Sequence, residues 1–85
     1  MKEWTYTIQD AVGMHARPAG LLVKEAQKFS SQVTENKDGK AADAKKLLKL
    51  MGLGVSCGDT VTITCEGADE EACAAALQTF FQEYL

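Results

Sequence analysis

The chain has 85 residues, of which 46% are hydrophobic and 25% are charged, as in an ordinary globular domain. A chain this short buries roughly 60 to 65% of its unfolded surface, so we expect a single domain, residues 1–85, without an enclosed substrate cavity. The net charge of −3 argues against nucleic acid as a partner, because phosphate contacts need a basic face. Neither the polar start of the chain nor its longest apolar run, residues 72–77, predicts targeting or membrane insertion. We therefore expect a cytoplasmic protein.

A strand and a helix are the first predicted elements. Residues 4–8 alternate large apolar side chains with threonine, the period-two pattern of a half-buried strand. Beyond Gly13, apolar residues recur at spacings of three and four, which predicts an amphipathic helix. Pro18 fits only in its first turn, where a missing N–H costs nothing. The helix should begin at about Ala16, with His15 at or next to the N-cap. Its apolar positions are Ala19, Leu22, Val23, Ala26 and Phe29.

A hairpin and a short helix are predicted in the middle of the chain. Residues 32–36 have a weaker strand pattern, and Asp38-Gly39 suits a type I′ turn, whose two central residues need positive φ. Residues 40–44 should therefore run back as a third strand. Residues 45–51 form a short helical stretch, and the glycines after it suit a C-terminal cap.

The last strand and the last helix complete a β-α-β-β-α-β-α order. Residues 61–65 alternate again, and acidic residues at 69–71 complement the dipole of a helix that begins there. Because the clearest strands alternate apolar with polar residues, one sheet face should be solvated. This predicts an α+β two-layer fold, a four-stranded, mostly antiparallel sheet with three helices on one face. The expected inward stripe of the last helix is Cys73, Ala76, Leu77, Phe80 and Tyr84.

The cysteines do not indicate a disulfide framework or a zinc site. Cys57, Cys65 and Cys73 are an odd number at spacings of eight, without a close Cys-x-x-Cys pair. Reduced thiols are the simplest account in a cytoplasmic protein. We expect Cys65 and Cys73 to be buried, and Cys57 to lie in a loop where its thiol can react.

The basic residues gather in one segment. Five lysines fall within thirteen positions, whereas the last twenty residues contain no Lys or Arg. Such a face suits an acidic protein partner, but a solvated lysine-rich face explains the composition equally well. The five residues are Lys37, Lys40, Lys45, Lys46 and Lys49.

His15 is the only histidine. A lone histidine is usually a surface or structural residue, but its neighbours here favour a functional one. Gly13 frees the backbone before it, and the unpaired first N–H groups of the helix, together with its dipole, form an anion site. Arg17 adds a charged fork that can donate two hydrogen bonds to phosphate, although by itself it would indicate only a solvated surface charge.

The same positive groups should tune the imidazole. A helix N-terminus and a nearby arginine disfavour the imidazolium, so we expect a neutral, nucleophilic ring at pH 7. A phosphoryl group accepted on this ring would meet those positive groups. One histidine without spaced Cys, Asp or Glu partners is a poor metal-ligand set, and a Gly-x-Ser-x-Gly nucleophile motif is absent. We therefore predict a phosphohistidine site without metal or cofactor.

Several segments share the pattern of one family. They are Gly-x-His-Ala-Arg-Pro-Ala at 13–19, Asn-Lys-Asp-Gly-Lys at 36–40, Ala-Lys at 44–45, Leu-Met-Gly-Leu-Gly at 50–54 and Glu-Gly-Ala-Asp-Glu-Glu at 66–71. With them the chain resembles, over essentially its whole length, the histidine-containing phosphocarrier HPr of the bacterial phosphoenolpyruvate-dependent sugar phosphotransferase system. The resemblance implies that family's open-faced β-sandwich with three helices, which agrees with the predicted element order.

The resemblance also implies a function. His15 would take phosphate on Nδ1 from phosphorylated enzyme I and pass it to a histidine of a sugar-specific enzyme IIA domain. Arg17 would stabilise the transferring phosphoryl group, together with the backbone N–H groups of Ala16 and Arg17. The chain would then be a monomeric phosphoryl carrier rather than a stand-alone enzyme.

The family's docking surface combines the first helix with the short second helix. This favours partner docking for the lysine-rich segment. For Leu47, Leu48 and Met51 the alternative is core packing, although Leu50 and Leu53 are better core candidates. By position the docking residues are Ala16, Arg17, Gly20, Lys24, Leu47, Leu48, Lys49 and Met51.

The sequence departs from the family at one regulatory position. Many relatives carry a serine just before the short helix that a dedicated kinase phosphorylates, and this chain has Lys46 there. Because lysine cannot accept that phosphate, we expect this switch to be absent. Lys46 also cannot cap the helix as serine could, and its charge meets the unfavourable end of the dipole.

Two alternatives to a transport carrier stay open. One is a paralogue that acts as a regulatory protein-binding module controlled by phosphorylation of His15. The other, much less favoured, is a metal-binding domain that uses His15 with Cys57.

Overall fold

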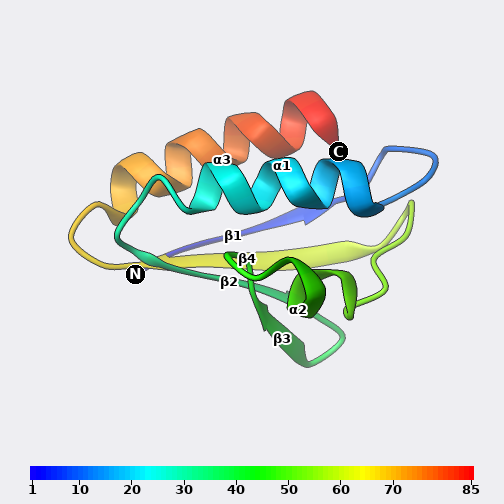
Figure 1. Cartoon of the computed structure of the whole chain (residues 1–85), viewed down its shortest axis with the longest axis horizontal. Coiled ribbons are helices and arrows are strands. Elements are labelled where there is room, and N and C mark those ends of the chain that lie inside the picture. The colour runs from blue at the N-terminus through cyan, green and yellow to red at the C-terminus, as the bar shows by residue number, and fades with distance from the viewer.

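The computed structural model describes residues 1–85 and has the predicted order of elements. Helices α1 and α3 lie side by side over one face of the sheet, and the short α2 packs against β3 and α1 (Figure 1). None of the three helices combines the length and the apolarity that crossing a membrane requires. The bounds are β1 Lys2–Thr7, α1 Ala16–Ala26, β2 Gln32–Lys37, β3 Lys40–Asp43, α2 Leu47–Met51, β4 Thr60–Glu66 and α3 Glu70–Tyr84.

The four strands form one sheet in the order β1-β4-β2-β3, and every neighbouring pair is antiparallel. The period-two patterns explain the two faces. Trp4 pairs with Ile63 on the side of the helices, whereas Thr5 pairs with Thr62 on the open side. The α+β fold predicted from the sequence, with its four-stranded sheet and three helices, is confirmed.

The hairpin between β2 and β3 is the predicted type I′ turn. Asp38 and Gly39 have φ values of +52° and +83°, and Lys37 pairs with Lys40 across the turn. Aspartate tolerates the left-handed region better than most side chains, and glycine has no Cβ to strain. The turn thereby fixes the register of β3 and the position of the chain that enters α2.

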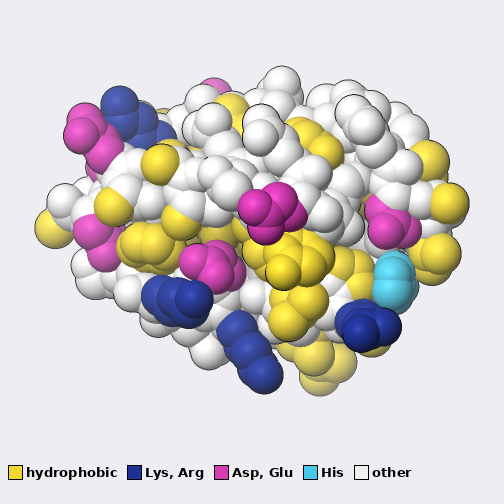
Figure 2. Space-filling model, turned by 90° about the horizontal axis from the view of Figure 1, so that it is seen from above, with side chains coloured by type: hydrophobic (Ala, Val, Ile, Leu, Met, Phe, Trp, Pro, Cys, Tyr) yellow, Lys and Arg dark blue, Asp and Glu magenta, His cyan; other side chains and the backbone are white.

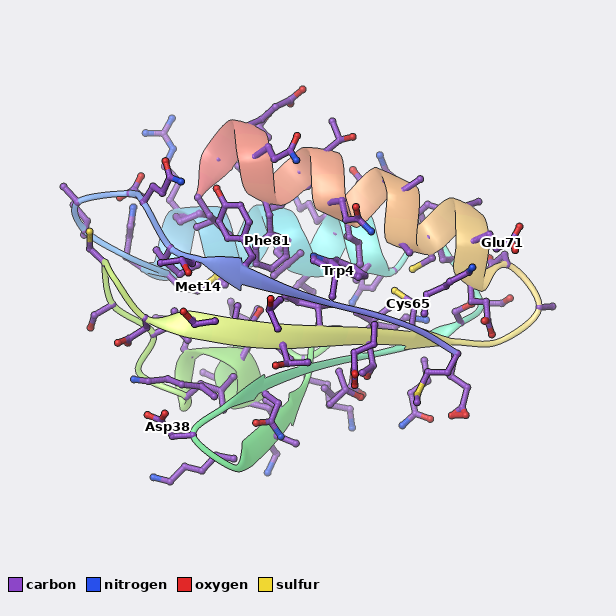
Figure 3. The ribbon with its side chains drawn as sticks, turned by 180° about the vertical axis from the view of Figure 1, so that it is seen from behind. Trp4, Met14, Asp38, Cys65, Glu71 and Phe81 are labelled. Carbon is purple, nitrogen blue, oxygen red and sulfur yellow. The ribbon has the colours of Figure 1, made fainter.

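The inward face of α3 differs from the prediction. Tyr84 is 48% exposed and Ala76 only half-buried, so their assignment to the core was wrong. The buried row runs instead from Cys73 through Leu77 to Phe81, whose ring meets Tyr6 of β1 edge-on at 5.5 Å between centroids. Figure 3 shows Phe81 between the helix and the sheet. Because β1 offers an aromatic partner there, Phe81 is buried and Tyr84 stays outside.

The turn between α1 and β2 is bound to the start of α3. Asp69, the N-cap of α3, accepts hydrogen bonds from the Ser30 amide, the Ser31 amide and the Ser31 hydroxyl. The hydrogen bond from the Ser31 hydroxyl is the main cause that lowers the Asp69 pKa to about 2. This contact joins the end of α1 to the beginning of α3, which keeps the two helices side by side.

Candidate functional site

The backbone before His15 requires a glycine. Gly13 has φ of +80°, and a Cβ there would lie 2.8 Å from both the Ser56 Cα and the Val55 carbonyl oxygen. The next residue, Met14, is buried and donates its amide to the same Val55 carbonyl at 3.1 Å. The loop before α1 is therefore pressed against the loop before β4, which fixes where His15 leaves the core.

His15 is the N-cap of α1, as predicted. Its backbone is extended, and its carbonyl accepts the first helical hydrogen bond from the Ala19 amide at 3.0 Å. Its side chain makes no capping hydrogen bond. The imidazole is partly exposed and is not used to hold the fold, so it is available for chemistry.

The first turn of α1 supplies unpaired donors beside this ring. The amides of Ala16 and Arg17 donate to no group of the protein, and Pro18 has no N–H to leave unpaired. No acidic side chain lies in this turn to neutralise the dipole. Arg17 is exposed and takes part in none of the ion pairs. Free N–H groups, a helix N-terminus and a free guanidinium together make a site for an anion.

A shallow pocket of about 320 Å³ opens at the histidine. Figure 2 shows the histidine with an acidic and a basic side chain on either side and hydrophobic side chains next to it. Sequence reasoning placed His15 and Arg17 here but did not single out three other lining residues, Asp10, Leu21 and Tyr84. The full lining is Asp10, His15, Arg17, Pro18, Leu21 and Tyr84.

Of the missed residues, Asp10 could have been found from a local sequence signal, whereas Tyr84 could not. Aspartate often forms a turn in which its side chain accepts a hydrogen bond from the backbone amide two residues later. The Asp10 carboxylate does this with the Val12 amide, at 2.9 Å. Tyr84 comes from the far end of α3, and no local pattern predicts that it meets α1. Only the packing of α3 on α1 brings it to the histidine.

The predicted docking residues are accessible. On α2, Leu48 is 85% exposed, and Leu47 and Met51 are also exposed, so core packing is wrong for these three side chains. Leu50 and Leu53 are buried, as expected. On α1, Ala16, Arg17 and Lys24 are exposed and Gly20 partly so. Since α1 and α2 pack together, these residues border the surface that carries His15.

The five lysines divide into bound and free groups. Lys37 donates to the Gly54 carbonyl at 2.8 Å and pairs with Asp59 at 2.9 Å, and Lys45 donates to the Phe29 carbonyl at 2.6 Å. These two stabilise the fold. Lys40, Lys46 and Lys49 are exposed and unpaired. Lys46 is the N-cap of α2 and makes no capping hydrogen bond. Only the free lysines can contribute charge to a docking surface.

The three cysteines lie as predicted. Cys57 is exposed in the loop before β4, whereas Cys65 and Cys73 are buried with their side chains in contact. Burial raises the pKa of both buried thiols, that of Cys65 to about 12. No group of three or more His, Cys, Asp or Glu side chains is arranged to hold a metal ion.

Comparison with known proteins agrees with this geometry. The family model described as the PTS HPr component phosphorylation site matches residues 2–83. The phosphocarrier protein HPr of Mycoplasma genitalium is 39% identical over 98% of this chain and 96% of its own length. The HPr-like protein Crh of Halalkalibacterium halodurans is also 39% identical, over 98% of this chain and 99% of its own.

Solved structures extend the similarity to three dimensions. HPr of Thermoanaerobacter tengcongensis superposes with a TM-score of 0.93 at 46% identity, over 98% of this chain and 93% of that one. An HPr dimer from the same organism has a TM-score of 0.78 at the same identity, over 98% and 95% of the two chains. The chain thus belongs to the HPr family of phosphocarrier proteins of the phosphotransferase system.

Proposed function

We propose that this protein is a cytoplasmic phosphoryl carrier in which His15 accepts a phosphoryl group on Nδ1 and passes it on. The observation that carries the proposal is the unused imidazole of His15 beside three unpaired donors. These are the Ala16 amide, the Arg17 amide and the Arg17 guanidinium. In the unphosphorylated protein these donors have no partner, so they are ready for the oxygens of a phosphoryl group.

The donors act on the charge that moves during transfer. A phosphoryl group passing between two nitrogens spreads negative charge over its three oxygens. The two backbone N–H groups can stabilise that charge without moving, because α1 already fixes them. The exposed Arg17 side chain has no partner to release and can turn its guanidinium fork onto the phosphoryl oxygens. His15 contributes the nucleophilic nitrogen and Arg17 a full positive charge.

We further propose that enzyme I supplies the phosphoryl group and that enzyme IIA domains receive it. The exposed apolar side chains of α2, with Leu48 the most exposed, provide a surface that a folded partner would bury. Lys24 and Lys49 lie on the same two helices and favour an acidic partner. The site is complete within one chain, so we expect the carrier to act as a monomer, which light scattering would test.

One reaction tests the proposal. The protein is mixed with phosphoenolpyruvate and enzyme I, and the product is examined for one phosphate that is labile in acid and stable in base. His15→Ala should abolish this label and leave the fold intact, because the His15 side chain holds no structural hydrogen bond. Label retained in His15→Ala, or no label on the wild-type protein, would contradict the proposal.

A second candidate is a regulatory module that binds target proteins according to the phosphorylation of His15. The observation that supports this candidate is the 39% identity to the HPr-like protein Crh. The two functions differ in the fate of the phosphate on His15. A transport carrier passes its phosphate to a IIA domain within a single turnover, whereas a regulatory module keeps the phosphate and changes its affinity for a target.

A further inference from the structure

The pocket beside His15 holds two opposite charges that do not pair with each other. Asp10 and Arg17 both line it, yet neither belongs to any ion pair of the protein. Opposite charges that share a pocket without pairing are both available to a ligand. Asp10 has no role in the proposed function so far. A carboxylate beside a phosphoryl site would by itself only repel the phosphate.

Asp10 is held firmly, with one oxygen to spare. Its amide donates to the Leu85 carbonyl at 2.8 Å, and its own carbonyl accepts the Gly13 amide at 2.9 Å. One carboxylate oxygen, Oδ1, accepts the Val12 amide. The other oxygen, Oδ2, bonds to no group of the protein. The loop therefore presents a positioned acceptor to the pocket.

Tyr84 forms an aromatic wall on another side of the pocket. Its ring lies 4.7 Å from that of buried Phe80, between centroids, at an interplanar angle of 32°. Phe80 thereby supports Tyr84 from behind while about half of Tyr84 stays exposed. Pro18 and Leu21 add apolar surface from α1. An aromatic face next to a carboxylate is a favourable place for a flat cation.

We propose that this pocket binds the protonated imidazole ring of the protein histidine that exchanges phosphate with His15. Asp10 accepts the N–H of that ring, Tyr84 stacks on it, and Arg17 binds the phosphoryl group that it carries. The inference rests on the proposed carrier function and adds to it a subsite for the ring. The charge pattern selects a cationic carrier, because an acyl phosphate or a nucleotide would bring additional negative charge toward Asp10.

The transfer step then needs no proton to move. The donor ring enters with phosphate on one nitrogen and a proton, bonded to Asp10, on the other. The Nδ1 lone pair of His15 forms the new N–P bond as the old N–P bond breaks, and its electron pair returns to the donor ring. The donor leaves as neutral imidazole, still bonded to Asp10, and His15 becomes the phosphorylated, protonated ring. Asp10 stabilises the form of the donor from which phosphate leaves most easily.

Two small donors test the subsite without a partner protein. N-phosphoimidazole carries the ring and acetyl phosphate does not, and phosphate on His15 is measured by intact mass. Asp10→Asn keeps an oxygen for the Val12 amide but removes the charge. This variant should slow transfer from N-phosphoimidazole about tenfold, in line with the loss of a partly exposed charge-assisted hydrogen bond. It should speed transfer from acetyl phosphate, because a repulsion is removed.

Tyr84→Leu removes the aromatic face on which the ring stacks. It should therefore slow only the N-phosphoimidazole reaction, severalfold.

The controls separate this inference from the proposed function. Glu71→Gln removes the same charge at the opposite end of α3, far from Met14 and the site loop (Figure 3), and should alter neither rate. The Asp10→Asn defect should also disappear at a pH where the donor ring is deprotonated. Equal slowing of both donors by Asp10→Asn, or no slowing with N-phosphoimidazole, would overturn the ring subsite while leaving the carrier intact. No phosphate on wild-type His15 from either donor would overturn both.

Discussion

At the residue scale, the fold fixes the backbone of His15 and leaves its ring free. The His15 amide donates to the Gly13 carbonyl, and its carbonyl accepts from Ala19. The motif around Gly13, His15 and Arg17 allowed this arrangement to be predicted, because a glycine break, an N-cap and a first-turn proline are all local signals. Asp10 and Tyr84 were not predicted as a pair, since their meeting depends on the hydrogen bond from the Asp10 amide to the Leu85 carbonyl, which joins residues far apart in the sequence.

Arg17 should matter for transfer and not for stability. Its side chain is exposed and forms no ion pair, so Arg17→Ala should change the free energy of unfolding by no more than about 0.5 kcal/mol. Transfer from phosphorylated enzyme I should slow about 10- to 100-fold, as expected when a charged hydrogen-bond partner of phosphate is lost. Arg17→Lys keeps the charge but loses the two-pronged geometry, so its transfer rate should lie between those of the wild-type protein and Arg17→Ala. Rapid-quench rates and thermal unfolding measure both effects, and a wild-type rate in Arg17→Ala would refute the role.

The three thiols should differ in reactivity. Cys57 is exposed, whereas burial keeps the pKa of Cys65 and Cys73 above the ordinary value of a thiol. An aromatic disulfide reagent at pH 8 should therefore modify one thiol in the folded protein and all three after denaturation. Cys57→Ser should show no fast reaction. Rapid modification of a second thiol in the folded state would mean that β4 and α3 open more easily than their packing indicates.

At the scale of elements, periodicity together with turn and capping signals predicted the order and type of all seven helices and strands. These signals predicted less well which face of a helix is buried and at which residue a helix begins. The inward stripe of α3 was misplaced by a rotation that brings Phe81 and not Tyr84 to β1, because the helix carries aromatic residues on neighbouring sides. Helix α2 begins at Leu47 rather than Lys45, since the backbone of Lys46 is extended and the Lys45 amide donates to the Asp43 carboxylate. Such choices depend on partners distant in sequence.

The N-cap of α2 can be improved and given a phosphate acceptor by one substitution. Lys46 makes no capping hydrogen bond, so Lys46→Ser should raise the free energy of unfolding by about 0.5 to 1 kcal/mol. Incubation with the family's serine kinase and ATP should add about 80 Da, one phosphate, to Lys46→Ser and nothing to the wild-type protein. A stoichiometric mass shift of the wild-type chain would show that this regulatory switch is present after all.

At the scale of the whole molecule, one acidic side chain lies among the buried apolar residues. Glu35 of β2 is fully buried, and neither carboxylate oxygen has a hydrogen-bond partner. It alternates with Val33 and pairs with Ile63 and Ala42 on the strands at either side. The alternation of β2 points residue 35 to the same side as Val33. Because that residue is a glutamate in a weak strand pattern, the sequence did not predict it in the core. Burial raises the Glu35 pKa from 4.5 to about 7.

This carboxyl should make the protein less stable as the pH rises. Between pH 4.5 and 7 the folded state holds the Glu35 proton and the unfolded state has lost it, so the free energy of unfolding falls with increasing pH. The loss should reach about 3 kcal/mol at pH 7 and change little above it. Urea unfolding across this range should show the decline in the wild-type protein and a much smaller one in Glu35→Gln. Exposed Glu71→Gln serves as the control and should retain the decline, whereas an equal slope in Glu35→Gln would exclude Glu35 as its source.

Nδ1 of His15 is the proposed attachment point of the phosphate, and every functional role assigned to the molecule depends on it. The most direct measurement is a phosphorus–nitrogen correlation spectrum of the ¹⁵N-labelled protein after reaction with phosphoenolpyruvate and enzyme I. The structure and the proposed function predict one phosphorus signal, coupled through one bond to Nδ1 of His15. Coupling to Nε2, phosphorus bound to oxygen, or an unphosphorylated His15 after complete reaction would contradict them.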